Sequence, residues 1–264
     1  MNMYLHELKA YRKSTIIWSC SLALLMVFFL SIYPSVAKEG EEFNKLIMSY
    51  PEAVRKAFGI IMDLTSFLGY YSYVFQYVIL FGAIQAMNLG TSIISKEVRQ
   101  KTADFLLTKP VKRSEIITSK LLAVLTSLVL TNIACTVFGA AIGNMVKVQD
   151  FSMKIFLLIS LTLFFVQIIF MALGAVISVA SAKIKSVIAV SVGTVFGFFI
   201  LNMFSLIIGD DALRYITPFR YFDTAYIIKN SGYEIQFLVI GLIFAVLATA
   251  ACYVIYTKKD IHAV

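Results

Sequence analysis

The sequence has few charged residues, and long stretches of it have none. Charged side chains make up 14% of the 264 residues and hydrophobic ones 60%, whereas a soluble domain typically has about 25% charged residues. Six stretches of 23 to 32 residues contain no Asp, Glu, Lys or Arg: 14–37, 64–95, 121–146, 155–182, 186–209 and 235–257. This composition excludes an ordinary soluble domain.

Each charge-free stretch is long enough to cross a membrane once, and none is long enough to cross it twice. A transmembrane helix needs roughly 20 apolar residues, and open backbone cannot be satisfied inside the bilayer. The sequence therefore predicts an all-α, polytopic membrane protein with six transmembrane helices in one domain over 1–264. The predicted spans lie at about 16–34, 66–95, 119–145, 154–180, 187–209 and 236–256.

Several types of reactive residue are also scarce. The six stretches contain no Asp, Glu or His, which argues against an intramembrane enzyme that uses acid–base groups or a metal. The three cysteines, Cys20, Cys135 and Cys252, fall inside predicted spans, where we interpret them as small packing residues rather than disulfide partners. His6 and His262 lie near opposite termini without metal-ligand spacing. We expect this chain to bind no metal or cofactor itself.

The basic residues predict the orientation in the membrane. Six spans place 1–13, 96–120, 183–185 and 258–264 on one side, with 14 Lys or Arg and five acidic residues. The other side has nine Lys or Arg and ten acidic residues, so the net charge is +9 on the first side and −1 on the second. Cytoplasmic loops carry an excess of Lys and Arg, so we expect both termini in the cytoplasm, at the plasma membrane of a bacterial cell. This topology explains the basic pI, and we expect no nucleic-acid partner.

Two segments outside the predicted spans have helical character. Near the N-terminus, 2–13 has apolar residues on one face, which favours an amphipathic helix in the membrane interface over a frayed tail. Between the fifth and sixth spans, 210–234 mixes charged with aromatic residues, and Pro218 would divide it. We expect short helices there that re-enter the outer leaflet without crossing it.

Amide side chains inside the predicted spans are candidates for a translocation path. Amides are costly in lipid unless they are hydrogen-bonded, so they should face either the bundle interior or a polar path. The candidates are Gln76, Gln85, Asn88, Asn132, Gln167 and Asn202. Two glycine pairs, Gly139 with Gly143 and Gly193 with Gly197, have the spacing of close helix contacts. We interpret both pairs as packing within one bundle rather than as a subunit interface.

The longest strongly charged segment, 95–120, cannot lie in hydrocarbon and must protrude. Its first part, 96–108, has a helical pattern, and Pro110 disfavours helix at the residue before it. One face of this helix would contain Val98, Thr102, Phe105 and Leu106. A second helix is expected to begin near Ser114. The apolar face would contact either the membrane surface or a cytoplasmic partner.

This charged segment resembles the signature of ABC transporter permeases of the type-2 exporter superfamily. The residues that carry the resemblance are Glu97, the pair Leu106 and Leu107, Pro110, Arg113 and Lys120. Thr102 stands where a Gly is common in relatives. The resemblance extends over the whole chain in topology, with an interfacial N-terminal helix, six spans, and TPFRYF after the fifth span.

The resemblance implies a division of labour between subunits. In this family the loop between the second and third spans docks on an ATPase subunit and transmits ATP-driven closure to the helices. By resemblance, the apolar face above would dock there, and the polar contacts would come from Glu97, Arg99, Lys101 and Asp104. The chain has no Gly-rich phosphate loop ending in Gly-Lys-Ser or Gly-Lys-Thr. ATP and Mg²⁺ would therefore bind the partner ATPase, and a second permease chain, identical or related, would complete the transporter.

The predicted function is that of the permease subunit of an ATP-driven exporter for a peptide, drug or lipid-like substrate. An ion-coupled secondary transporter is one alternative. The lack of ionisable residues in the spans argues against proton coupling, whereas sodium coupling could use amides and carbonyls. No inverted repeat is visible in the sequence, which also disfavours a carrier. A membrane scaffold subunit is the other alternative.

The charge split leads to a test of the topology. A cysteine introduced at His262 should resist a membrane-impermeant thiol reagent in intact cells and react after permeabilisation, because the C-terminus is expected in the cytoplasm. A cysteine at Asn230, in the segment 210–234, should show the opposite behaviour. Labelling at position 262 in intact cells would contradict the predicted orientation.

Overall fold

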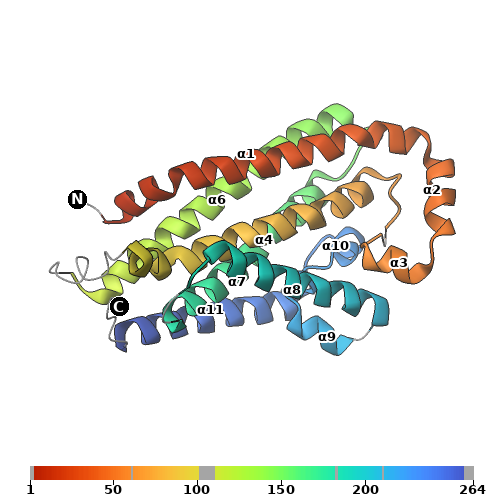
Figure 1. Ribbon diagram of the computed structural model, residues 1–264. Helices are drawn as coiled ribbons and strands as arrows, with labels where there is room; N and C mark the ends of the chain where they lie inside the picture. Colours follow the sequence, from red (N-terminus) through yellow and green to blue (C-terminus); the bar gives the residue numbers. More distant parts are fainter. Residues whose placement is uncertain (1–2, 61, 101–110, 182–183, 210, 259–264) are drawn as a thin grey trace.

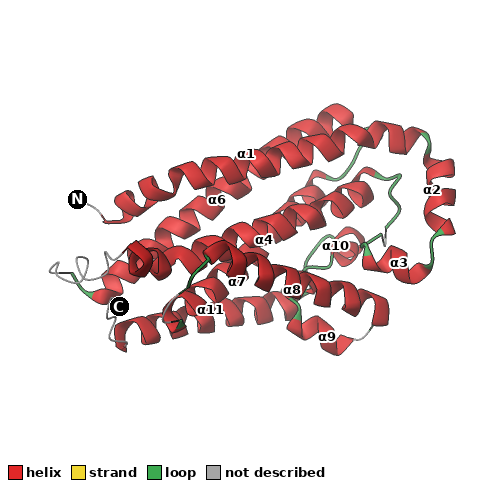
Figure 2. Cartoon of the chain, in the orientation of Figure 1, coloured by secondary structure: helices red, strands yellow, loops and turns green. Residues whose placement is uncertain are grey.

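The structure, a computed structural model, describes residues 3–60, 62–100, 111–181, 184–209 and 211–258 (Figure 1). Every regular element in these residues is a helix (Figure 2), which confirms the all-α prediction. The long helices are α1 (Met3–Lys38), α4 (Phe67–Gln100), α6 (Arg113–Val146), α7 (Met153–Ala180), α8 (Val187–Ile208) and α11 (Ile235–Lys258). The short ones are α2 (Gly40–Ser49), α3 (Glu52–Ala57), α9 (Asp211–Ile216), η1 (Pro218–Arg220) and α10 (Thr224–Asn230).

Each of the six long helices is long and apolar enough to cross a membrane, as expected from the sequence, and the exact bounds of the spans stay a prediction. The six helices form an elongated bundle in which α1 begins and α11 ends at one end, whereas α2, α3, α9 and α10 lie at the other (Figure 1). With 34 or 36 residues, α1, α4 and α6 are each about 50 Å long. This exceeds the roughly 30 Å of the hydrocarbon core, so these three helices extend beyond it.

The N-terminal segment is not a separate helix. The predicted interfacial helix over 2–13 is the first part of α1, which continues to Lys38. The physical reason is that no Pro or Gly occurs before Pro34, so nothing interrupts the helical hydrogen bonds. Helix α1 also packs along α6, where Ser19 Oγ donates to Thr131 Oγ1 at 3.1 Å. The predicted boundary between an interfacial helix and the first span is therefore wrong.

Helix α4 is the centre of the bundle and packs most closely against α7. In the most apolar 18-residue stretch of α4, 83% of the residues are buried, compared with 22% in the same stretch of α8 and of α11. A Cβ atom on Gly174 of α7 would lie 2.7 Å from the carbonyl oxygen of Met87. A Cβ atom on Gly90 of α4 would lie 2.3 Å from the carbonyl oxygen of Met171. The two backbones thus approach to a distance that only glycine allows.

The two glycine pairs singled out from the sequence lie in different environments. A Cβ atom on Gly139 would lie 2.6 Å from a side chain of α1. A Cβ atom on Gly143 would lie 2.7 Å from a side chain of α4. This confirms that the first pair packs within the bundle. A Cβ atom on Gly193 or Gly197 would meet no described atom within 4 Å. The packing interpretation is wrong for this second pair, because α8 lies at the edge of the bundle.

The segment between α8 and α11 is divided at Pro218, as predicted from the sequence. Helix α9 ends before it, η1 begins with it, and α10 follows after a short turn. Asp223 starts α10, since its Oδ1 accepts a hydrogen bond from the backbone N–H of Ala225 at 2.8 Å. Re-entry of these short helices into the outer leaflet stays a prediction.

Because α4 and α7 pack so closely, a larger side chain at the contact should lower the stability of the chain, whereas one elsewhere should not. Gly174→Leu should destabilise the purified chain, because overpacking costs about 1–3 kcal/mol and the obstructing atoms here are backbone atoms of α4. Gly197→Leu is the matched control, since its Cβ meets open space. Thermal unfolding in detergent measures both variants. Equal unfolding temperatures would contradict the close α4–α7 packing.

Candidate functional site

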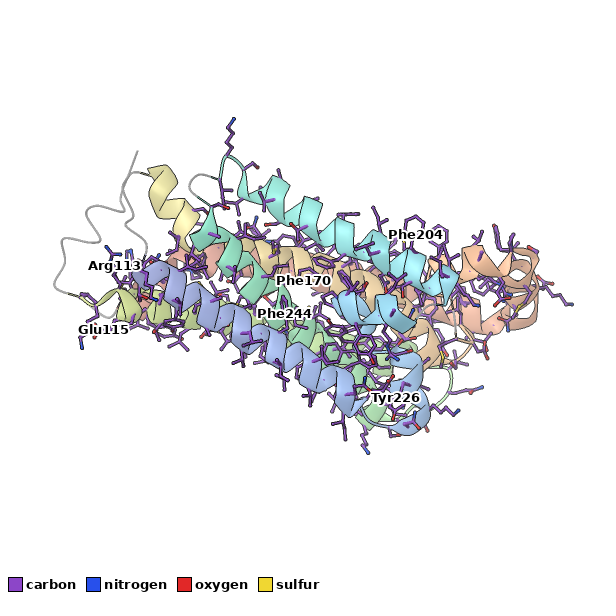
Figure 3. All side chains as sticks on the ribbon, turned by 90° about the horizontal axis from the view of Figure 1, so that it is seen from below. Arg113, Glu115, Phe170, Phe204, Tyr226 and Phe244 are labelled. Atoms are coloured by element: carbon purple, nitrogen blue, oxygen red, sulfur yellow. The ribbon has the colours of Figure 1, made fainter. Side chains whose placement is uncertain are left out.

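The residues predicted to contact an ATPase belong to the end of the bundle where α4 ends and α6 begins. Glu97, Val98 and Arg99 lie in the last turns of α4, so the predicted helix over 96–108 starts as a continuation of that helix. Lys101, Thr102, Asp104, Phe105 and Leu106 fall outside the described residues. Arg113 and Glu115, in the first turn of α6, lie at this end, opposite to Tyr226 of α10 (Figure 3).

A buried ion pair joins α1 to α6 near this end. Lys120 Nζ donates to Glu7 Oε1 at 3.0 Å, and the two side chains are only 3% and 10% exposed. Taking two charges out of water is costly, and their attraction offsets that cost only in good geometry. The first turns of α1 are thereby fixed to the part of α6 that follows the charged segment.

Three of the predicted amides meet near the middle of the spans, and we call Gln85, Asn132 and Gln167 the amide cluster. Asn132 Nδ2 donates to Gln167 Oε1 at 2.6 Å, and Gln167 Nε2 donates to Gln85 Oε1 at 3.2 Å. Gln85 Nε2 donates in turn to Thr131 Oγ1 at 2.9 Å, which also accepts from Ser19. Four helices, α1, α4, α6 and α7, share this network. Gln85 and Gln167 are buried in the bundle interior, one of the two orientations expected from the sequence, whereas Asn132 is partly exposed and its Oδ1 has no partner among the described residues.

Two further amides, Gln76 of α4 and Asn202 of α8, line a small chamber at the opposite end of the bundle from the ion pair. We call it the outer chamber, because the predicted orientation places this end of the bundle outside the cell; it has a volume of about 90 Å³ and is lined by residues of η1 and of the start of α10. Its other polar side chains are Ser72, Arg220, Asp223 and Thr224, and aromatic side chains form part of the wall. Asn88, one turn from Gln85, is partly buried and belongs neither to the amide cluster nor to this chamber.

The two amides of the outer chamber differ in their hydrogen bonding. Gln76 Nε2 donates to the carbonyl oxygen of Phe58 at 2.6 Å, which ties α4 to the end of α3. Asn202 is 8% exposed, and its Oδ1 accepts no hydrogen bond from the described part of the chain. Arg220 Nη1 donates to Ser205 Oγ of α8 at 3.3 Å. The chamber thus contains a buried acceptor whose hydrogen-bonding capacity is unused within these residues.

The short helices that close the chamber are held by polar and aromatic contacts. Arg214 Nη2 lies 2.5 Å from Glu234 Oε1, and its guanidinium lies 3.8 Å from the centroid of the Phe237 ring. A cation over an aromatic face is attracted by the ring quadrupole. Tyr233 Oη donates to the carbonyl oxygen of Leu158 in α7 at 2.6 Å. These contacts fasten the α9–α10 segment to α7 and α11.

The loop before α4, which borders the chamber, is ordered by one carboxylate. The backbone N–H of Thr65 donates to Asp63 Oδ1 at 3.0 Å, and its hydroxyl donates at 2.8 Å. These hydrogen bonds hold the pKa of Asp63 below its usual range, because they favour the charged form. The loop is joined to α1 by Tyr33, whose Oη donates to the carbonyl oxygen of Thr65 at 3.1 Å.

A comparison with protein families identifies the family of the chain. A family model described as "ABC-2 family transporter protein" matches residues 1–261, almost the whole chain. The chain belongs to this family. No curated protein matches it. Membership confirms the resemblance inferred from the charged segment.

ABC-2 permeases generally pair with ABC ATPase subunits, and the ATPase activity lies in those separate subunits. This ABC-2 chain is a multi-pass membrane protein of the permease type. Among its described residues, no group of three or more His, Cys, Asp or Glu side chains could hold a metal ion.

The sequence analysis did not predict the ion pair of this ABC-2 permease. A signal for it existed. Lys120 borders the charge-free stretch 121–146, where a buried charge needs a partner, and Glu7 is the only acidic residue in 1–13. The unused acceptor of Asn202 had no signal in the sequence, because it depends on how η1 and α8 meet.

The ion pair predicts a large and specific loss of stability. Lys120→Met leaves the Glu7 carboxylate buried without its partner and should cost about 3–5 kcal/mol. The double variant Glu7→Gln with Lys120→Met should recover much of this loss, because no unpaired charge remains. Lys56→Met is the matched control, since it removes an exposed pair with Glu52, and exposed pairs contribute little to stability.

Chemical unfolding of the purified chain in detergent measures these variants. A loss for Lys120→Met as small as that for Lys56→Met would contradict the role assigned to the buried pair.

Proposed function

We propose that this chain is the membrane-spanning permease of an ATP-driven exporter and forms the path for a peptide, drug or lipid-like substrate. A separate ATPase subunit binds ATP and Mg²⁺, and a second permease chain completes the transporter. The observation that carries the proposal is the family match over residues 1–261. The absence of a phosphate-binding loop in the sequence supports the need for a separate ATPase.

The segment over 96–108 is proposed as the element that couples this chain to the ATPase. Val98, Thr102, Phe105 and Leu106 would form the docking face, flanked by the charged Glu97, Arg99, Lys101 and Asp104. Support comes from its position between α4 and α6, two helices long enough to extend beyond the hydrocarbon core. A displacement of this segment would act on both helices, and on α1 through the Glu7–Lys120 pair.

Within the bundle, the outer part of the translocation path is proposed to run past Gln76 and Asn202. These amides line a chamber, whereas Gln85, Asn132 and Gln167 are linked to one another by hydrogen bonds, with Asn132 Oδ1 left without a partner among the described residues. The cluster would then hold helices together rather than contact substrate. We further propose a plasma-membrane location with both termini in the cytoplasm, supported by the charge split of +9 and −1.

An ion-coupled transporter and a scaffold subunit are distinguished from an exporter by their energy source. Reconstituted exporter should move substrate only when its ATPase and ATP are present. Transport driven by a sodium gradient without ATP would favour the carrier, and a lack of any transport with intact binding of partners would favour the scaffold.

The coupling role predicts that a charge on the docking face separates the subunits. Phe105→Asp should lower recovery of the ATPase that co-purifies with the wild-type chain by orders of magnitude. Burying an unpaired charge costs several kcal/mol, and each 1.4 kcal/mol is about tenfold in affinity. Insertion should be unaffected, because the position lies outside the lipid core.

Val148→Asp is the matched control, because Val148 is exposed in the loop between α6 and α7 at the other end of α6. It should retain the ATPase. If Phe105→Asp recovers the ATPase like the wild type, with undiminished substrate-stimulated hydrolysis, then this segment is not the coupling element.

A further inference from the structure

The outer chamber contains one strong hydrogen-bonding group that is not used by the described residues. Asn202 Oδ1 is buried and accepts no hydrogen bond from them. Buried polar atoms nearly always have a partner, and a buried acceptor is costly to leave unsatisfied. The neighbouring donors bond elsewhere: Ser72 Oγ donates to the carbonyl oxygen of Gly69 at 2.8 Å, Gln76 Nε2 to that of Phe58 and Arg220 Nη1 to Ser205 Oγ. A ligand of this chamber would therefore bring a hydrogen-bond donor.

The charges of the lining favour a neutral ligand. Arg220 and Asp223 both line the chamber, so one positive and one negative formal charge offset each other. Both groups also have bonds within the protein, Arg220 to Ser205 and Asp223 to the backbone of α10. An anion would meet the carboxylate and a cation would meet the guanidinium. A neutral hydroxyl or amide N–H is repelled by neither group.

The size and the walls of the chamber define the rest of the ligand. Its volume of about 90 Å³ is well below the about 300–1,000 Å³ of sites for drug-sized ligands. It can therefore take the polar end of a molecule and not a whole one. Phe199, Phe219 and Phe222 contribute apolar wall, which suits an apolar body attached to that polar end.

We propose that the outer chamber binds a neutral hydrogen-bond donor, a hydroxyl or an amide N–H, carried on an apolar molecule, and that Asn202 Oδ1 accepts its hydrogen. This inference rests on the proposed permease function and narrows its substrates to neutral amphiphiles. Charged peptides and organic anions would be poor ligands of this chamber. Asn202 acts here as a specificity-determining residue near the outer end of the path.

The test uses the full chain in phosphatidylcholine nanodiscs without any ATPase. Cys135 and Cys252 are buried and Cys20 is exposed, so in a Cys20→Ala background a thiol-reactive dye reports unfolding. The probes are 1-dodecanol and dodecyl methyl ether, which differ in one hydrogen-bond donor and partition similarly into the lipid. The alcohol should raise the unfolding temperature at about tenfold lower concentration than the ether, the ratio that corresponds to about 1.4 kcal/mol.

Asn202→Leu removes the acceptor and should abolish this preference, so that alcohol and ether act at equal concentrations. The variant should fold, because replacing an unpaired buried polar group by an apolar one of similar size is nearly neutral or stabilising. Asn144→Leu is the matched control. Asn144 is an exposed amide of α6 that donates to Ala140 of its own helix at 3.0 Å, and the variant should keep the wild-type preference.

Two results would overturn the proposal. One is equal action of alcohol and ether on the wild-type chain, which also decides the matter if Asn202→Leu fails to assemble. The other is an unchanged preference in Asn202→Leu, which would mean that the alcohol acts at another site and not on Asn202. Because no ATPase is present, either result leaves the permease function standing if Phe105→Asp still uncouples the ATPase. Conversely, a preference for the alcohol without ATPase coupling would refute only the permease function.

Discussion

Every polar side chain inside a span must find its hydrogen-bond partners within the protein, because lipid offers none. In this chain the amide cluster of Gln85, Asn132 and Gln167 meets most of that constraint and draws one face of each of three helices toward a common point, whereas Asn132 Oδ1 and Asn202 Oδ1 have no partner among the described residues. The contacts of Gly90 and Gly174 set how closely α4 and α7 approach. The amides set how each helix is rotated about its axis. Together they explain why α4 is the most buried helix.

Helices α8 and α11 are under weaker constraint. Only 22% of the residues in the most apolar 18-residue stretch of each helix are buried. A Cβ atom placed on Gly193 or Gly197 of α8 would meet no described atom within 4 Å. Near its outer end α8 is tied to η1 by Arg220 and Ser205. A segment with few buried contacts opens at lower free-energy cost than a core element. The outer chamber therefore lies between the most fixed helix, α4, and one of the least fixed, α8, where a rearrangement during transport is least costly.

The sequence predicted those features that depend on local composition. The six spans were predictable because charge-free apolar stretches of this length are stable in lipid. The break at Pro218 was predictable because proline interrupts a helix. The inward orientation of Gln85 and Gln167 was one of two expected outcomes and needed the structure to be decided. The Glu7–Lys120 pair and the unused acceptor of Asn202 depend on residues far apart in the chain. The separate N-terminal helix was wrong because an amphipathic pattern does not show where a helix ends, and 2–13 contains no residue that would end it.

The unbroken α1 has a consequence for how the two ends of the bundle communicate. At one end it is fixed to α6 by Glu7 and Lys120. At the other end Tyr33 Oη donates to Thr65, and Tyr70 Oη of α4 donates to the carbonyl oxygen of Phe29 at 2.8 Å. A helix of this length without a break transmits a displacement of its first turns along its axis. Movement of the charged segment at the start of α6 would thus reach the loop that borders the outer chamber, which a separate N-terminal helix joined by a flexible link could not achieve.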